Sequence, residues 1–157
     1  HEVCLLHADL MITENSIFAI ELSARPSGHN LHNLFTPLAT GIDMAEQYIR
    51  SQCNMDYTYE PAKTEKLLIH YFNLEQCRIK TIPQASQLRL PQGITLKAWN
   101  CRITPGDYMQ KVTTGHSLMG RGYFILQSAP PRPSASETTE TNLINAADHI
   151  LTQFETE

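Results

Sequence analysis

The fold is decided by residues 7–25, His-Ala-Asp-Leu-Met-Ile-Thr-Glu-Asn-Ser-Ile-Phe-Ala-Ile-Glu-Leu-Ser-Ala-Arg. Two apolar runs of strand length flank a polar break at residues 13–16, and this pattern predicts a β-hairpin. Side chains alternate between the two faces of a strand. One face of each strand is therefore apolar: Leu6, Ala8, Leu10 and Ile12 in the first strand, and Phe18, Ile20 and Leu22 in the second.

The opposite faces carry the polar groups: His7, Asp9 and Met11 in the first strand, and Ala19, Glu21, Ser23 and Arg25 in the second. Loop length decides whether these faces meet, because a one-residue slip turns a whole strand over. A three-residue loop over 14–16 places Asp9 opposite Glu21, with Cβ atoms roughly 4.5–5.5 Å apart. A four-residue loop would place Asp9 opposite Ile20 and remove the basis for a site.

Two carboxylates this close repel each other, so a shared proton, a cationic side chain or a divalent metal must offset the repulsion. Arg25, two same-face positions beyond Glu21, would supply part of the positive charge. Carboxylates completed by water and phosphate oxygens suit Mg²⁺ or Mn²⁺. The competing interpretation is a half-exposed hairpin whose charges are simply solvated, which is ordinary on an open sheet face.

Two motifs resemble those of ATP-grasp ligases. Residues 21–25, Glu-Leu-Ser-Ala-Arg, resemble the family's E-x-N-x-R signature, and Thr-Gly-Ile-Asp-Met at 40–44 looks like its TGIDL helix. Asp9 precedes Glu21 by twelve residues, a spacing that the family uses. Ser23 is a departure, because the family usually has Asn at that position.

The resemblance implies the C-terminal part of an ATP-grasp enzyme of the carnosine-synthase-like or amino-acid-ligase type. It implies an α+β fold with an antiparallel β-sheet and packed helices. Residues 1–55 would be the end of the catalytic lobe, and residues 56–157 a β-rich subdomain with a terminal helix.

The resemblance also assigns roles to particular residues. It implies metal ligation by Asp9 and Glu21 with Ser23 as a further candidate, adenine packing by Met11, contact of Arg25 with the transferred phosphoryl as the catalytic cation, and substrate contact by Gly28 and His29. A core methionine and a simple turn are the other interpretations of Met11 and Gly28. His7 shares the polar face, and we expect it to pair with Asp9.

The implied reaction joins a carboxylate to an amine, most simply on amino acids, with ATP as substrate and Mg²⁺ or Mn²⁺ as cofactor. A second hypothesis is a bicarbonate-activating relative of biotin carboxylase or carbamoyl-phosphate synthase. Biotin carboxylases place a Glu soon after the signature Arg, whereas Pro-Ser-Gly-His-Asn follows Arg25 here, which favours amine ligation. A third hypothesis is a non-catalytic binding or assembly module.

Composition limits the partners. The 157 residues carry a formal charge of −4, which gives no electrostatic case for nucleic acid or an anionic membrane. No apolar run approaches the ~20 residues of a membrane span, and no signal-peptide pattern is present. The four cysteines form no C-x-x-C pair, so reduced, mostly buried thiols in a cytoplasmic protein are expected.

The sequence lacks a Walker-type phosphate loop, and the chain begins at His1 without Met. We therefore expect the N-terminal lobes of the same enzyme to be missing partners, with a homodimer left open as the assembly. The isolated chain is expected to bind ATP weakly and to catalyse no turnover.

Beyond the hairpin, apolar spacing predicts helices over 31–38 and 42–52, packing beneath the hairpin, with Pro37 as a kink or a restart. A linker follows at 54–64. Strands are predicted at 66–72, 76–82, 94–100, 108–112 and 122–127, arranged as an antiparallel meander or barrel-like layer. A capping box at 134–137 and an apolar stripe to Phe154 predict a final helix that covers the β-layer.

Overall fold

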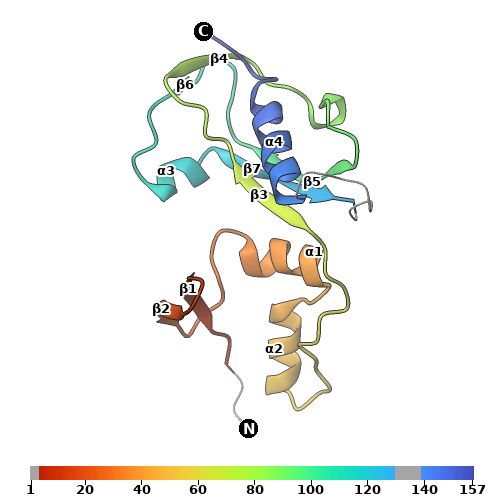
Figure 1. The fold of residues 1–157 in the computed structure, drawn as a ribbon. Helices are drawn as coiled ribbons and strands as arrows, with labels where there is room; N and C mark the ends of the chain where they lie inside the picture. Colours follow the sequence, from red (N-terminus) through yellow and green to blue (C-terminus); the bar gives the residue numbers. More distant parts are fainter. Residues whose placement is uncertain (1–3, 130–138) are drawn as a thin grey trace. The chain divides into compact units, whose positions relative to one another are not determined.

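The computed structural model describes residues 4–129 and 139–157. The chain forms two compact units, His1–Thr64 and Glu65–Glu157, each built from antiparallel strands and a few helices (Figure 1). The α+β class is therefore confirmed. The division falls at the end of the predicted linker. Within the described residues, no helix has the length and apolar character needed to cross a membrane.

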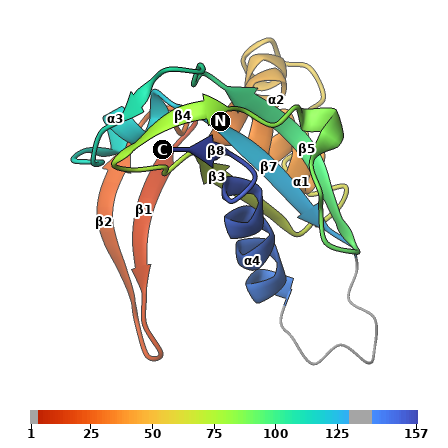
Figure 2. The same ribbon diagram turned by 90° about the horizontal axis from the view of Figure 1, so that it is seen from above.

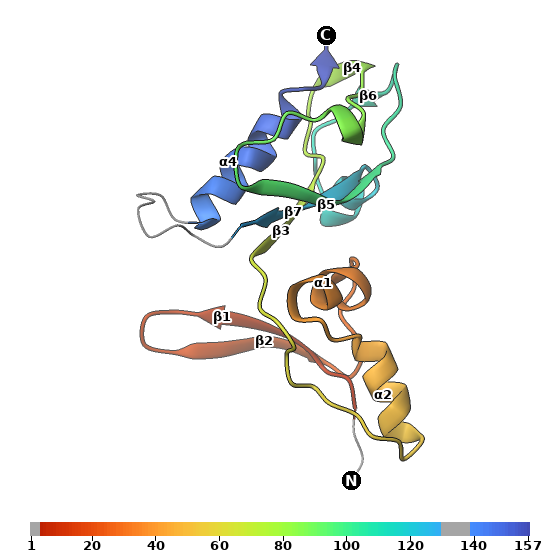
Figure 3. The same cartoon turned by 90° about the vertical axis from the view of Figure 1, so that its right-hand side faces the viewer.

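The first unit contains β1 (His7–Ile12), β2 (Ile17–Ser23), α1 (Thr36–Thr40) and α2 (Met44–Gln52). The two strands form the predicted hairpin. Figures 2 and 3 show the hairpin as two long strands that extend away from α1 and α2. Residues 8–22 are exposed on both faces, so the expectation that the helices pack beneath the hairpin is wrong.

The hairpin loop differs from the one expected. Ile12 pairs with Ile17, which leaves residues 13–16 outside the ladder, and the Thr13 amide donates to the Ser16 carbonyl at 2.9 Å. The Thr13 hydroxyl oxygen accepts the Ser16 amide at 3.1 Å, where a regular turn would use the backbone carbonyl. The polar side chain of Thr13 thus closes a tight tip at Glu14 and Asn15.

Pro37 explains the form of the first helical segment. A π-helical turn over Leu31–Phe35 leads directly into α1, which has Pro37 in its first turn. A proline lacks the N–H that an α-helix needs and clashes with the carbonyl four residues earlier. The wider π turn avoids that clash. Gly41 ends α1 in a left-handed conformation, and Asp43 then caps α2 by accepting the Glu46 amide at 3.0 Å.

The second unit contains β3 (Leu67–Tyr71), β4 (Cys77–Thr81), β5 (Ile94–Cys101), β6 (Tyr108–Met109), α3 (Gly115–Met119), β7 (Gly122–Ser128), α4 (Thr139–Leu151) and β8 (Glu155–Thr156). All five strands predicted in this region are present. Their order is not a meander: one sheet runs β3-β7-β5 and the other β6-β4-β8. The short strand β8 was not predicted; it pairs with β4.

Helix α4 packs on the β3-β7-β5 sheet and closes the core of the second unit (Figures 1 and 3). Four aromatic rings contact one another, three of them buried in this core and Trp99 packed against it, with neighbouring centroids 5.0–6.3 Å apart: Phe72, Trp99, Phe124 and Phe154. The helix ends at Leu151, and Phe154 follows it into the core. The predicted capping box at 134–137 lies outside the described residues.

All four cysteines are free. Cys4 and Cys53 are exposed, so the expectation of mostly buried thiols is wrong for these two.

Candidate functional site

The polar face of the hairpin brings the two acids together. Asp9 and Glu21 are direct cross-strand partners, as the site hypothesis requires. The loop and the strand register that produce this pairing differ from those predicted. The numbers of the paired residues sum to 29 from Leu10 to the loop and to 30 from Asp9 to His7, because Ile20 is an extra residue that forms a β-bulge. The bulge compensates for the longer loop.

Each acid contacts one neighbour on the same strand. His7 Nε2 lies 3.3 Å from Asp9 Oδ1, which confirms the expected pair. The Ser23 hydroxyl donates to Glu21 Oε1 at 2.6 Å. His7 and Ser23 are themselves cross-strand partners, so the four side chains form two adjacent rows across the hairpin. Asp9 and Glu21 are both exposed, which leaves their carboxylates open to a ligand.

Next to the acids lies an apolar pair, of which the sequence predicts only Met11 on this face. Met11 pairs with Phe18, so both share the face of Asp9 and Glu21. Regular alternation had placed Phe18 on the opposite face, and the bulge at Ile20 reverses that assignment. Met11 and Phe18 are 53% and 55% exposed, so they form an open apolar surface beside the carboxylates.

Arg25 lies beyond the end of β2 and does not continue the strand alternation. Its backbone amide donates to the Ser23 carbonyl at 2.8 Å, which turns the chain directly after the strand. Its guanidinium donates to the Pro26 carbonyl at 3.1 Å. The expectation that Arg25 occupies the next same-face position of the strand is therefore wrong. Its contact with a phosphoryl group stays a prediction.

The loop after Arg25 has an unusual backbone. His29 and Asn30 both have positive φ, at 59° and 62°. The His32 ring hydrogen-bonds the Ser27 carbonyl and closes the loop. A Cβ added at Gly28 would meet nothing within 4 Å. The backbone of the loop is thus open at Gly28, and the substrate roles of Gly28 and His29 stay predictions.

No group of three or more His, Cys, Asp or Glu side chains among residues 4–129 and 139–157 is arranged to hold a metal ion. The donors on the hairpin fit a different arrangement. Mg²⁺ is usually held by one or two carboxylates together with water and substrate phosphates. Asp9 and Glu21 match that donor set, and phosphate oxygens would complete it.

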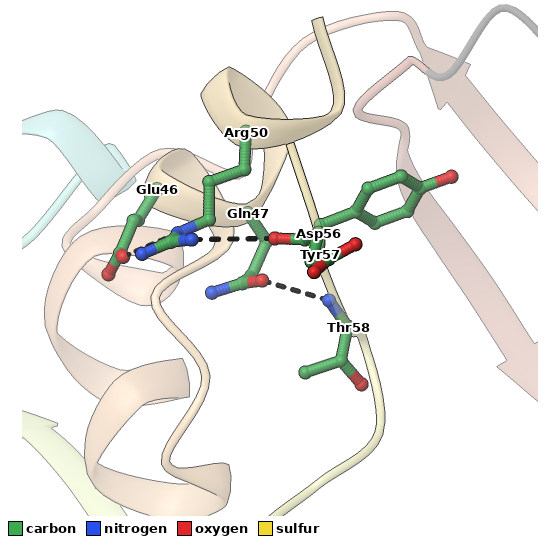
Figure 4. Close-up of a pocket in the computed structure, with 6 residues that line it drawn as sticks. All are labelled: Glu46, Gln47, Arg50, Asp56, Tyr57 and Thr58. Atoms are coloured by element: carbon green, nitrogen blue, oxygen red, sulfur yellow. Dashed lines mark hydrogen bonds and ion pairs between the residues drawn. The ribbon is translucent and has the colours of Figure 1, made fainter. Parts of the chain in front are cut away.

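A separate hollow of about 320 Å³ lies in the first unit, lined by Glu46, Gln47, Arg50, Asp56, Tyr57 and Thr58 (Figure 4). Several of its polar groups already bind one another. Arg50 Nε donates to Glu46 Oε1 at 2.8 Å, and Gln47 Oε1 accepts the Thr58 amide at 2.9 Å. These hydrogen bonds hold the segment after α2 against the helix. Because those groups are already paired, the hollow is a poorer ligand site than the hairpin.

The chain was compared with models of known protein families, with curated proteins and with solved structures. None of the three comparisons gave a match. The likeness to ATP-grasp ligases thus depends on the residues of the hairpin and of the segment that leads into α2.

Phe18 is the residue that sequence reasoning missed at this site. A signal for it was present in the polar break, since all four of residues 13–16 are polar. With that loop length, the two acids can face each other only if the second strand contains one extra residue. The same extra residue puts Phe18 beside Met11.

Proposed function

We propose that this chain is part of an ATP-dependent carboxylate–amine ligase of the ATP-grasp type, and that the polar face of its hairpin binds a magnesium–nucleotide. The observation that carries the proposal is the direct pairing of Asp9 with Glu21. The pairing depends on the bulge at Ile20. Bulges are frequent next to active sites, where they change the direction of a side chain.

The chemistry explains the residue types. A substrate carboxylate attacks the γ-phosphorus of ATP, ADP leaves, and an acyl phosphate forms. The amine nitrogen then attacks the acyl carbon, loses a proton and expels phosphate. The first step brings anions together, and a bound Mg²⁺ neutralises phosphate charge in such reactions.

Residues of this chain would position the groups. Asp9 and Glu21 would hold the metal–phosphate complex, and Met11 with Phe18 offers an apolar surface beside it. Arg25 stays charged at all relevant pH values and presents a planar fork suited to phosphoryl oxygens. The turn that places Arg25 just past β2 keeps it at the end of the strand that bears Glu21.

The apolar face of the hairpin supports a role within a larger sheet. Leu10, Ile12, Ile17 and Leu22 are each at least 50% exposed. A two-stranded hairpin is marginally stable by itself, and apolar patches of this kind often mark interaction surfaces. The proposal accounts for this face, because an ATP-binding lobe outside this chain would cover it.

The test is binding of Mg·ADP to the 157-residue chain, followed by ³¹P NMR at millimolar nucleotide. We expect weak binding that disappears when EDTA removes the metal. D9N and E21Q should each weaken binding at least tenfold. The matched control is E14Q, which removes an acid from the tip of the same hairpin and should bind as the wild type does.

Two results would contradict the proposal. One is the absence of Mg-dependent nucleotide binding in the wild-type chain. The other is equal binding by wild type, D9N and E21Q, which would favour the non-catalytic module.

A further inference from the structure

One face of the hairpin consists entirely of apolar side chains. Directly opposed residues of an antiparallel pair share a face. The register gives this face three rows of paired residues: Ala8 with Leu22, Leu10 with Ala19, and Ile12 with Ile17. All six are exposed, and the leucines and isoleucines among them are each 50–73% exposed. These six residues are the apolar face, and the acids Asp9 and Glu21 lie on the opposite, polar face.

We propose that the apolar face is a dimerisation surface, on which the hairpins of two copies of the 157-residue chain pack face to face. The inference goes beyond the proposed function, which concerns nucleotide binding at the polar face of the same strands. A lobe outside this chain would occupy the same apolar surface, so the lobe and a second copy exclude each other.

Charge decides which face can meet its own copy. Two copies joined through the polar face would bring four carboxylates, from Asp9 and Glu21, into one interface. Like charges that face each other across an interface are costly. The apolar face carries no charge, so contact between two copies of it brings no like charges together. The acids then lie on the two outer surfaces, in contact with water.

The order of large and small side chains suits contact between two identical faces. With a two-fold axis parallel to the strands, β1 of one copy lies over β2 of the other, row by row. Leu10 then faces Ala19 of the second copy, and Ala8 faces Leu22, so each leucine meets an alanine. Large side chains opposite small ones let two layers interdigitate. A contact of this symmetry closes on itself and therefore stops at two copies.

The area is sufficient for a weak dimer. At roughly 100 Å² for each large side chain and roughly half that for each alanine, the two faces together bury about 1,000 Å². That value is the lower limit for a specific interface, and interfaces of this size form transient complexes. We therefore expect a dissociation constant of roughly 10–100 µM. The second sheet layer also supports a two-stranded hairpin that is only marginally stable by itself.

The test is sedimentation of the 157-residue chain in the analytical ultracentrifuge, from about 1 µM to about 1 mM. The wild type should change from monomer to dimer over this range. L10K places a charge on the apolar face and should raise the dissociation constant at least tenfold. M11K is the matched control, because Met11 is 53% exposed against 50% for Leu10 but lies on the polar face. M11K should dimerise as the wild type does.

Disulfide cross-linking tests the arrangement without relying on L10K. A C4S/C53S background removes the two exposed thiols. In that background, L10C chains mixed with A19C chains should form disulfides between copies, because the two-fold axis places these positions opposite each other. M11C mixed with F18C is the control, since both positions lie on the polar face and should not cross-link.

Three results would overturn the inference: a monomer at every concentration, equal weakening by L10K and M11K, or cross-linking of L10C with A19C no faster than that of M11C with F18C. The test is separate from that of the proposed function. If L10K prevents dimerisation while the chain binds no Mg·ADP, the dimer stands and the proposed function fails. If the chain binds Mg·ADP and stays monomeric, the reverse holds.

Discussion

Replacement of Gly122 by Ala is the sharpest test of the second unit. Gly122 is the first residue of β7, has a φ of +95°, and pairs with Cys101 at the end of β5. A Cβ built on Gly122 would lie 1.8 Å from the backbone oxygen of Asn100 and 3.2 Å from the amide nitrogen of Arg102. The obstacle is backbone, so no side-chain rotation can relieve it.

Two terms set the size of the effect. A residue with a Cβ in a left-handed conformation costs roughly 1–2 kcal/mol. Moving the Asn100 carbonyl away breaks one or two hydrogen bonds of the β5–β7 ladder, which costs about 1–3 kcal/mol more. G122A should therefore lower the free energy of unfolding by about 2–5 kcal/mol. For a unit of this size, that corresponds to a fall in Tm of roughly 10–30 °C.

The assay is urea unfolding followed by fluorescence of Trp99, the one tryptophan, which is partly buried and packs against the core of the second unit. Gly106 provides a matched control, because its φ is +97° but an added Cβ would meet nothing within 4 Å. G106A should thus cost only about 1–2 kcal/mol. G115A, at an ordinary φ with one contact at 3.9 Å, should be close to neutral. If G122A costs no more than G106A, the argument from the close backbone contact is refuted.

Three further changes have defined outcomes. Burial lowers the pKa of His70 below 6.5, against an opposing effect of Asp148. The free energy of unfolding should therefore lose nothing from His70 above pH 6.5 and should fall as the pH drops towards the lowered pKa. H70Q should flatten this pH dependence in urea titrations, and H149Q should not. Gly28→Ala should leave Tm unchanged, because a Cβ there meets nothing within 4 Å, and a large fall in Tm would show that the loop is packed. Phe154→Ala should cost about 3–5 kcal/mol by removing a ring that is 6% exposed, and a loss below 1 kcal/mol would mean that the aromatic cluster is not the core.

Much of the second unit follows from its sequence. The apolar runs at β3 and β7, the mixed apolar and polar stretches at β4 and β5, and the turn residues between them predict the strands to within one or two residues. Strand order was beyond the sequence, because local pattern shows which residues form a strand and does not show which strands pair. Strand β8 has one charged and one polar residue and is too short to show an alternation, and it follows directly on Phe154, which is buried in the core.

The hairpin shows how a correct pairing can come from a wrong loop. The opposition of Asp9 and Glu21 was predicted from a three-residue loop. The chain instead uses the Thr13 hydroxyl to close a longer break, and the extra residue at Ile20 restores the register. No residue type marks a bulge in advance, so the face of Phe18 could not be assigned by alternation alone.

Arg25 illustrates a different limit. Its place two residues after Ser23 was extrapolated from the strand, but the chain turns directly after Ser23. A strand end is set by hydrogen bonds that local sequence only weakly specifies, and Pro26 restricts the residue before it. The direction of the guanidinium is therefore a result of the turn and not of the strand.

The central claim is that Asp9 and Glu21 share one divalent cation on the hairpin. Mn²⁺ titration into the ¹⁵N-labelled 157-residue chain tests this most directly, because Mn²⁺ broadens the NMR signals of nearby amides. The account predicts that the amides of residues 8–10 and 20–22 broaden first, and that D9N or E21Q abolishes this pattern while E14Q retains it. Broadening centred on the loop tip or elsewhere in the chain, or a pattern unchanged in D9N and E21Q, would contradict the claim.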